Sequence, residues 1–311
     1  MSGNVAFLFP GQGSQFVGMG ATFIESSADA KKRVEEASDA LGFDIGKMIL
    51  QGPEEELRLT SNTQPAILLV SVIALEALLA KTAIEPSVVA GHSLGEFSAC
   101  WAAGAIGFTD VIRLVRKRGE LMQSAVPVGK GGMAAIIGLC AKEIHAVCEE
   151  AGGDVAPANF NSPQQTVIAG EALSVSRAID IAKSKGAKRA LSLPVSAPFH
   201  TKMMIPAQEG LAKFLETIKI NNPGIPVLRN VDGGVSRQAE EIKEGLIRQV
   251  TGCVQWVDSM RNLVGMNVTT ALEIGPGKVL CGLMKRIDKS VKTMQVGSSE
   301  EVEKAVEALN G

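Results

Sequence analysis

The sequence predicts an α/β fold with a mainly parallel sheet, because strand-like and helix-like segments alternate along most of its 311 residues. Three short strands are expected at 5–9, 87–91 and 269–274, and the first is a continuous apolar run of the kind found in strands buried on both faces. Each segment ends at, or is followed by, a glycine or proline, which marks where the strand stops. Between about 126 and 200 the strands and helices follow one another in a different order, which predicts a smaller inserted unit.

Helices are expected between these strands. One begins near Gln64, with Pro65 close to its first position, where a proline is tolerated. Its apolar stretch, 66–80, is interrupted by polar residues and is too short to span a bilayer. A second helix is expected from Gly95 onward, and a third over 109–123 has apolar residues at helical spacing.

The inserted unit follows a glycine-rich linker at 127–132. Its expected elements alternate as strand, helix, strand, strand, helix and strand, at 133–138, 141–150, 155–160, 166–169, 172–185 and 187–193. This order is typical of the ferredoxin-like split unit. We therefore expect a small subdomain over 126–200 and a large domain formed by 1–125 and 201–311.

Composition and charge limit the classes of function. A net charge of −2 gives no positive field that would favour nucleic acid as the main ligand. The five cysteines show neither metal-ligand spacing nor an even disulfide framework, so a reducing compartment is expected. No basic segment precedes the short apolar stretch near the N-terminus, which argues against a secretory leader. We expect a cytoplasmic protein that binds neither nucleic acid nor membrane and holds no metal.

A candidate nucleophile lies at the end of the second predicted strand. The segment Gly91-His92-Ser93-Leu94-Gly95 matches the G-x-S-x-G pattern at a strand-to-helix junction. On such a sharp turn the serine hydroxyl projects toward substrate, and the N-terminus of the following helix faces a developing oxyanion. A glycine-rich chain also matches this short pattern by chance, so a purely structural turn is the alternative.

A serine nucleophile needs a proton acceptor, and the chain has three histidines. His92 neighbours the serine on the tight turn, so its ring should point away, and His145 lies in a predicted helix of the small unit. By elimination His200, in a loop where the two units rejoin, is the candidate base, with a packed loop histidine as the alternative. Its orienting partner stays open: a backbone carbonyl, or one of Asp110, Asp154 and Asp180.

One arginine lies on the wrong face of a helix. In the predicted helix 109–123, Arg118 falls in the middle of the apolar face, whereas the other charged residues lie opposite. A buried guanidinium is costly unless an anion pairs with it. The anion is either an internal carboxylate or the carboxylate of a substrate held beside the serine.

A glycine-rich loop follows the first strand, at 9–16. Phe16 stands where a dinucleotide fingerprint needs glycine, and no Gly-Lys-Ser/Thr follows, so neither phosphate-binding motif fits. The loop either supplies a second oxyanion donor or is a plain tight turn.

Together these segments resemble the malonyl-CoA:acyl carrier protein transacylase family of fatty acid synthesis. The resemblance spans essentially the whole chain and rests on FPGQGSQ, TQPA, GHSLGE, RGELMQ, NFNSP, VSAPFH and EIGPG, which occur in this order between 9 and 277. It implies an α/β-hydrolase-like large domain with a ferredoxin-like small one.

The resemblance also implies roles for individual residues. Ser93 would be the nucleophile, His200 the base, and Arg118 the ligand of the malonyl carboxylate, with no metal or redox cofactor. Five further residues would surround the substrate: the backbone N–H groups of Gln12 and Leu94 as the oxyanion hole, Gln249 near His200, and Met122 and Phe199 beside the acyl group. Phe199 would also crowd a branched methylmalonyl group.

The implied reaction is a ping-pong transfer of malonyl from malonyl-CoA to acyl carrier protein through an ester on Ser93. Acyl carrier proteins are acidic, so Lys188, Arg189, Lys285 and Arg286 are candidate docking residues, although such pairs are also common on solvated surfaces. A monomer is expected. Two rivals remain: a serine hydrolase with water as acceptor, and a carrier-binding module without catalysis.

Overall fold

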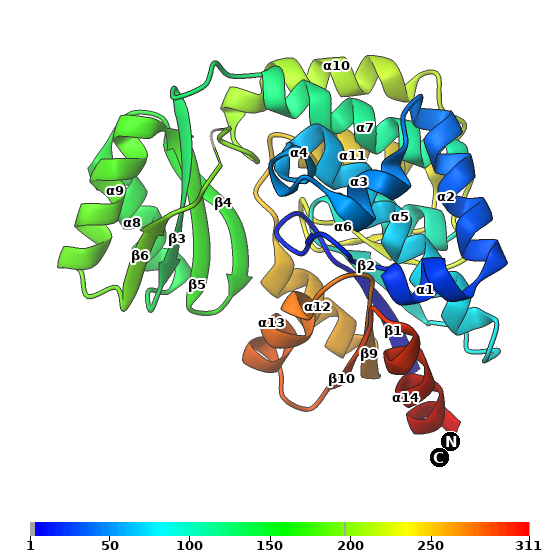
Figure 1. Ribbon diagram of the computed structural model, residues 1–311. Coiled ribbons are helices and arrows are strands. Elements are labelled where there is room, and N and C mark those ends of the chain that lie inside the picture. Colours follow the sequence, from blue (N-terminus) through cyan, green and yellow to red (C-terminus); the bar gives the residue numbers. More distant parts are fainter. Residues whose placement is uncertain (1–3, 196, 311) are drawn as a thin grey trace.

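The computed structural model describes residues 4–195 and 197–310, which form a large lobe and a small lobe (Figure 1). The large lobe is built on a six-stranded sheet with the order β10-β9-β1-β2-β7-β8. The strands are β1 (Asn4–Phe9), β2 (Val88–Gly91), β7 (Val227–Leu228), β8 (Val235–Ser236), β9 (Val268–Ile274) and β10 (Lys292–Val296). All neighbours are parallel except β7 and β8, as the alternation of strands and helices predicts.

Helices cover both faces of this sheet because side chains alternate along each strand. Phe7 and Phe9 of β1 point into a core shared with α5 and α6, whereas Ala6 and Leu8 face α12 and α13. The helices before the small lobe are α1 (Ala21–Ser26), α2 (Ala28–Leu41), α3 (Ile45–Gln51), α4 (Glu54–Arg58), α5 (Thr60–Leu79), α6 (Leu94–Ala102) and α7 (Phe108–Ser124). Those after it are η1 (Lys202–Met204), α10 (Ile205–Leu215), α11 (Ala239–Gln249), α12 (Trp256–Gly265), α13 (Val279–Ile287) and α14 (Ser299–Asn310).

The small lobe, green in Figure 1, is a four-stranded antiparallel sheet with two helices. Its elements follow the predicted order: β3 (Gly131–Ile137), α8 (Ala141–Ala151), β4 (Val155–Ser162), β5 (Gln165–Glu171), α9 (Ala172–Ser184) and β6 (Arg189–Ser192). The sheet order is β4-β5-β3-β6. Ala134, Ile136 and Ile168 pack under α8 and α9, so this lobe has a core of its own. The expected fold is confirmed at this level, as two sheets of different type.

Backbone hydrogen bonds join the two lobes beside β4. The N–H of Phe160 donates to the carbonyl of Val254 at 2.9 Å, and the N–H of Val254 donates to the carbonyl of Ala158 at 2.8 Å. Close by, at the start of β5, Arg286 Nη1 of α13 donates to Gln165 Oε1 at 2.6 Å. The end of the small sheet at the β4–β5 turn is therefore bonded to the large lobe through both strands.

Helix α5 differs from its predicted form. It begins at Thr60, so Pro65 lies inside the helix rather than near its first position. Proline has no N–H, which leaves the carbonyl of Ser61 without its usual helical donor, and Arg116 Nη1 of α7 donates to that oxygen at 3.2 Å. A neighbouring helix thus supplies the bond that the proline removes.

Helix α5 is also longer than its apolar stretch suggested. Among the described residues it is the one helix long and apolar enough to cross a bilayer. However, 83% of its most apolar window is buried inside the protein, where it packs against α6, α7 and α14. These contacts are those of a core helix.

Candidate active site

Ser93 lies on a strained turn between β2 and α6. Its backbone φ of 51° is in the left-handed region, which a serine rarely adopts. The turn requires glycine on both sides: a Cβ on Gly91 would lie 1.9 Å from the carbonyl carbon of Gly95, and one on Gly95 would lie 2.0 Å from the oxygen of Phe9. The G-x-S-x-G pattern is thus explained by close backbone packing, and strain of this kind is typical of active sites.

The structure brings His200 to Ser93. Ser93 Oγ lies 2.8 Å from His200 Nε2, and His200 Nδ1 lies 2.8 Å from the backbone oxygen of Gln249. A carbonyl can only accept, so Nδ1 carries the proton and Nε2 is free to take one from the serine. Of the acids considered as alternatives, Asp154 instead pairs with Lys202.

His200 is kept neutral by its surroundings. Burial and, after it, the nearby positive charge of Arg118 together lower its pKa to about 3, against the opposing effect of the hydrogen bond to Gln249. The imidazole is therefore in its basic form at neutral pH.

Arg118 reaches the same cleft from α7, although it is only 2% exposed. Its Nη2 donates to Ser93 Oγ at 3.1 Å and to Gln249 Oε1 at 2.8 Å, and its Nη1 donates to Gln64 Oε1 at 2.8 Å. Its Nε–H is buried without a partner among the described residues. Burial lowers the pKa of Arg118 to about 10, opposed by the charge of Glu96, so the guanidinium stays charged at neutral pH.

Three residues of this network were missed by the sequence analysis: Gln64, Glu96 and Asn230. Gln64 and Glu96 are buried polar residues on helices that are otherwise largely apolar, so the criterion that identified Arg118 would have found both. Asn230 lies in a loop, and its Oδ1 accepts from the Ser93 N–H at 2.6 Å while its Nδ2 donates to the Gly91 carbonyl at 2.7 Å. No helical or strand pattern marks such a residue.

Among the described residues, neither of the other two histidines is hydrogen-bonded to Ser93, although His92 lines the same cleft. His92 Nε2 is 2.7 Å from Asn161 Oδ1 of β4, and its ring packs against that of Trp256. His145 is exposed on α8, with its ring near that of Phe160.

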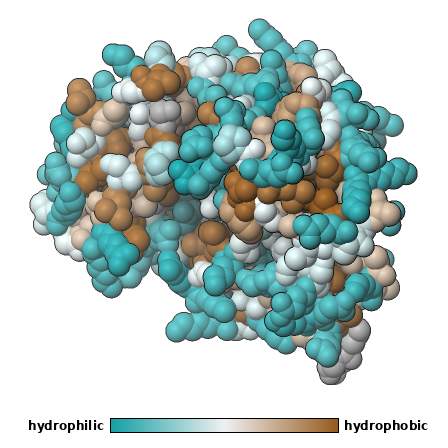
Figure 2. Space-filling view, viewed as in Figure 1, coloured by the Kyte–Doolittle hydropathy of each residue, from teal (hydrophilic) through white to brown (hydrophobic). Residues whose placement is uncertain are grey.

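Ser93, His200 and Arg118 line one cleft of about 290 Å³ between the lobes. The surface in Figure 2 is hollowed where the two lobes meet. Gln12 and Leu94 line the same cleft, and within the described ranges neither backbone N–H takes part in a hydrogen bond. Its apolar wall comes from both lobes and consists of Met122, Met133, Val167, Leu193, Val195 and Phe199.

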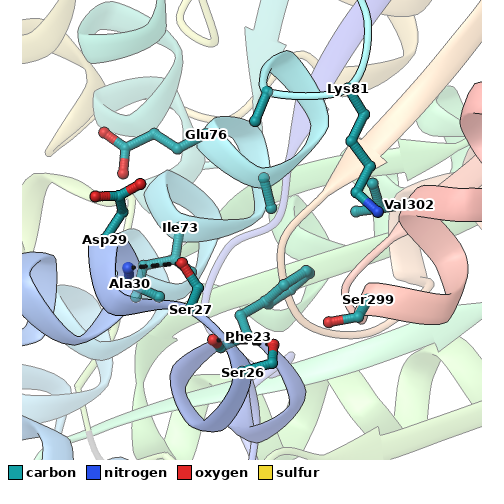
Figure 3. A pocket seen from close by; sticks show the side chains of 12 residues that line it. Phe23, Ser26, Ser27, Asp29, Ala30, Ile73, Glu76, Lys81, Ser299 and Val302 are labelled. Atoms are coloured by element: carbon teal, nitrogen blue, oxygen red, sulfur yellow. Dashed lines mark hydrogen bonds between the residues drawn. The ribbon is translucent and has the colours of Figure 1, made fainter.

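A second hollow, of about 360 Å³, lies between α1, α2, α5 and α14 (Figure 3). Its polar groups already serve the local structure: Ser27 Oγ accepts from the Ala30 N–H at the start of α2, and Glu76 pairs with Arg33. It contains no histidine and no cysteine, so it lacks the groups for acyl transfer. Within residues 4–195 and 197–310 there is also no cluster of three side chains suited to a metal.

The four candidate docking residues are all exposed. Two of them approach one corner of the small sheet: Lys188 packs against Gly138, whose N–H donates to the carbonyl of Gln164, and Arg286 binds the adjacent Gln165. One residue of each pair thus lies beside the same turn.

Comparison with known proteins agrees with this geometry. The model of the acyl transferase domain matches residues 6–304. The malonyl CoA-acyl carrier protein transacylase of Bacillus subtilis is 46% identical over 308 residues, covering 98% of this chain and 97% of the relative. Among solved structures, the malonyl CoA-acyl carrier protein transacylase of Coxiella burnetii has a TM-score of 0.98 to this chain at 41% sequence identity. The match covers 100% of this chain and 99% of the Coxiella chain.

A further solved structure, PlMCAT:AntF, is described as a type II PKS acyl-carrier protein in complex with its malonyl-transacylase. Its TM-score to this chain is 0.96 at 46% sequence identity. The match covers 98% of this chain and 99% of the matched chain. A family model that matches nearly the whole sequence, together with such relatives, leads to one conclusion. The chain belongs to the acyl transferase family.

Proposed function

We propose that this protein transfers a malonyl group from malonyl-CoA to acyl carrier protein. The observation that carries the proposal is a buried guanidinium, that of Arg118, within 3.1 Å of the hydroxyl of a Ser–His pair. The relatives named above are malonyl transacylases, which agrees with this chemistry.

In the first half-reaction, Ser93 Oγ attacks the thioester carbon while His200 Nε2 takes the hydroxyl proton. The carbon–sulfur bond breaks, and the departing sulfur receives that proton and leaves as the thiol of coenzyme A. The N–H groups of Gln12 and Leu94, which line the cleft without other partners, would stabilise the oxyanion. In the second half-reaction, the pantetheine thiol of the carrier protein attacks the malonyl ester by the same steps in reverse.

Arg118 distinguishes this chemistry from hydrolysis of a neutral ester. Its charge has no carboxylate in direct contact among the described residues, and its Nε–H lacks a partner. The free carboxylate of a malonyl group would supply both the negative charge and an acceptor. Met122 and Phe199 would then pack against the short acyl chain.

The basic corner around Gln164 and Gln165 is the proposed docking site for the acidic carrier protein. Support comes from the proximity of Lys188 and Arg286, which belong to different lobes. Arg189 and Lys285, the neighbours of those two residues in the sequence, are exposed as well.

The finer description of the fold is part of the same proposal. Residues 126–200 would be a ferredoxin-like subdomain, supported by the order β4-β5-β3-β6. Residues 1–125 and 201–311 would be an α/β-hydrolase-like domain, supported by the strand–turn–helix that carries Ser93. We further propose a cytoplasmic monomer.

The decisive experiment is intact mass spectrometry after mixing with malonyl-CoA, followed by addition of acyl carrier protein. The expected result is one malonyl adduct on Ser93, which disappears as malonyl-carrier protein forms. Loss of the adduct to water at a rate that the carrier protein does not change would favour a hydrolase. Absence of any adduct would favour a carrier-binding module without catalysis.

A matched control comes from two serines. Ser93→Ala should give no adduct. Ser98→Ala should react normally, because Ser98 is buried on α6 and its hydroxyl has no partner among the described residues.

A further inference from the structure

A buried carboxylate lies beneath the nucleophile, and the proposed chemistry does not use it. Glu96 is on α6, one turn after Ser93, and is 2% exposed. Its Oε2 accepts from Gln249 Nε2 at 2.6 Å and from the Asn230 N–H at 3.1 Å. A buried carboxylate is costly, so its contacts deserve a functional explanation.

Both partners of Glu96 hold Ser93. Asn230 accepts from the Ser93 N–H through Oδ1, and Gln249 Nε2 donates to the Ser93 carbonyl at 2.9 Å. The backbone oxygen of Gln249 also binds His200 Nδ1. The nucleophile and the base are therefore fixed by two residues that share one carboxylate.

The same carboxylate, together with the Ser93 carbonyl, fixes which way the Gln249 amide faces, because both accept from Nε2. An amide can donate only through its nitrogen and accept only through its oxygen. Because Glu96 accepts from Nε2, the oxygen Oε1 is left facing Arg118 Nη2, from which it accepts at 2.8 Å. A carboxylate, an amide and a guanidinium thus form a chain in which each group determines the orientation of the next.

We propose that Glu96 is a positioning residue that keeps the Gln249 amide oxygen turned toward Arg118. The hydrogen bond from Arg118 to that oxygen then holds the guanidinium beside the hydroxyl of Ser93. Among the described residues, the carboxylate of Glu96 makes no hydrogen bond to Ser93 Oγ or to Arg118, and its hydrogen bonds are those from Gln249 and Asn230. This inference rests on the proposed function, because the position of the Arg118 guanidinium matters only when the acyl group carries a carboxylate.

The test is single-turnover acylation of Ser93 by malonyl-CoA and by acetyl-CoA in the wild type and in Glu96→Gln. Glutamine has nearly the same shape, but it carries no charge and can turn its own amide toward Gln249. A misplacement of about 1 Å costs on the order of 100-fold in rate, which we expect for malonyl, with roughly a 10-fold loss for acetyl because acetyl does not use Arg118.

Glu273→Gln is the matched control. Glu273 is another buried glutamate of the large lobe, but its carboxylate accepts from the N–H groups of Leu280 and Cys281 at the start of α13 and makes no bond to Gln249 or Asn230 among the described residues. This variant should lower the melting temperature and leave both acylation rates unchanged. A loss in Glu96→Gln that is no greater for malonyl than for acetyl would overturn the proposal.

The pH profile of the wild type gives a second readout that needs no variant. Burial raises the pKa of Glu96 to about 7, opposed by the hydrogen bonds from Gln249 and Asn230 and by the charges of Arg118 and Arg229. On its own helix Cys100 is the titratable neighbour, and α11 presents the uncharged Gly245.

Protonation removes the negative charge of Glu96 and so weakens the hydrogen bonds that Gln249 and Asn230 donate to it, and the malonyl acylation rate should therefore fall as the pH is lowered through about 7. His200, with a pKa of about 3, does not titrate there. A flat profile across that pH in folded wild-type protein contradicts the proposal even if Glu96→Gln fails to fold. Absence of an adduct in the wild type would instead count against the proposed function, so the two failures are distinguishable.

Discussion

The two lobes contribute different things to the cleft. The large lobe provides Ser93 and Arg118, and it holds His200, at the point where the chain returns from the small lobe, through the backbone oxygen of Gln249. The small lobe lines the same cleft with Met133, Val167 and Leu193 and with asparagine side chains of β4. The large lobe therefore holds the reacting groups, whereas the small lobe helps to decide what fits beside them.

The lobes also differ in how their contributions are held. Ser93, His200 and Arg118 belong to a hydrogen-bonded network that includes Gln64, Glu96, Asn230 and Gln249, all of them buried. The small lobe contacts the cleft mainly through apolar packing, which is less sensitive to exact direction. Substitutions in the network should change rates strongly, and those in the apolar wall or on the surface should change selectivity or affinity moderately.

The largest effect should come from the base. In His200→Ala the hydroxyl of Ser93 loses its proton acceptor, so acylation should slow by roughly 10²- to 10⁴-fold. The measurement is the single-turnover rate of adduct formation, with the melting temperature determined in parallel. His145→Ala is the control, since His145 is exposed on α8. Unfolding of His200→Ala with a normal rate in the folded fraction would point to a packing role.

Arg118→Ala should separate two substrates. Malonyl transfer should fall by roughly 10²- to 10³-fold, because removing one partner of a buried charge pair costs a few kcal/mol. Acetyl transfer should be retained or rise, because acetyl presents no carboxylate to the lost guanidinium. Arg113→Ala, on the exposed side of α7, serves as the control. Equal loss with both acyl-CoA substrates would make Arg118 a structural residue.

Two of the residues proposed to act on the substrate could be singled out from the sequence because each leaves a local pattern. Ser93 lies in a turn that needs flanking glycines, and Arg118 interrupts the apolar face of α7. The order of elements in the small lobe could also be predicted, since each segment is short and strongly periodic.

What could not be predicted depends on contacts between distant segments. The group that orients His200 is the backbone oxygen of Gln249, and a backbone carbonyl leaves no trace in the amino-acid pattern. The bond from the Asn230 N–H to Glu96 joins residues 134 positions apart. The start of α5 was also missed, because its Pro65 is tolerated only through the bond that Arg116 makes to Ser61.

The apolar wall offers a smaller effect on selectivity. Phe199 is nearly buried in the cleft beside His200, so Phe199→Ala should make room for a branched methylmalonyl group. One methyl group in an apolar pocket is worth on the order of 10-fold, which is the expected gain in the methylmalonyl-to-malonyl ratio. Competition between the two acyl-CoA thioesters, read as adduct masses, measures it. Leu191→Ala, exposed on β6, should leave the ratio unchanged.

The smallest effect should come from the surface, where charges are screened by solvent. Replacing Lys188, Arg189, Lys285 and Arg286 by alanine should raise the KM for acyl carrier protein several-fold, which is in the range of a few exposed charge pairs. Adduct formation from malonyl-CoA should not change, because this step does not involve the carrier protein. Lys31→Ala combined with Lys32→Ala, on exposed positions of α2, is the control for a general change in charge. An equal loss in both half-reactions would mean that the four residues support the fold, and a loss that persists at high salt would argue against electrostatic docking.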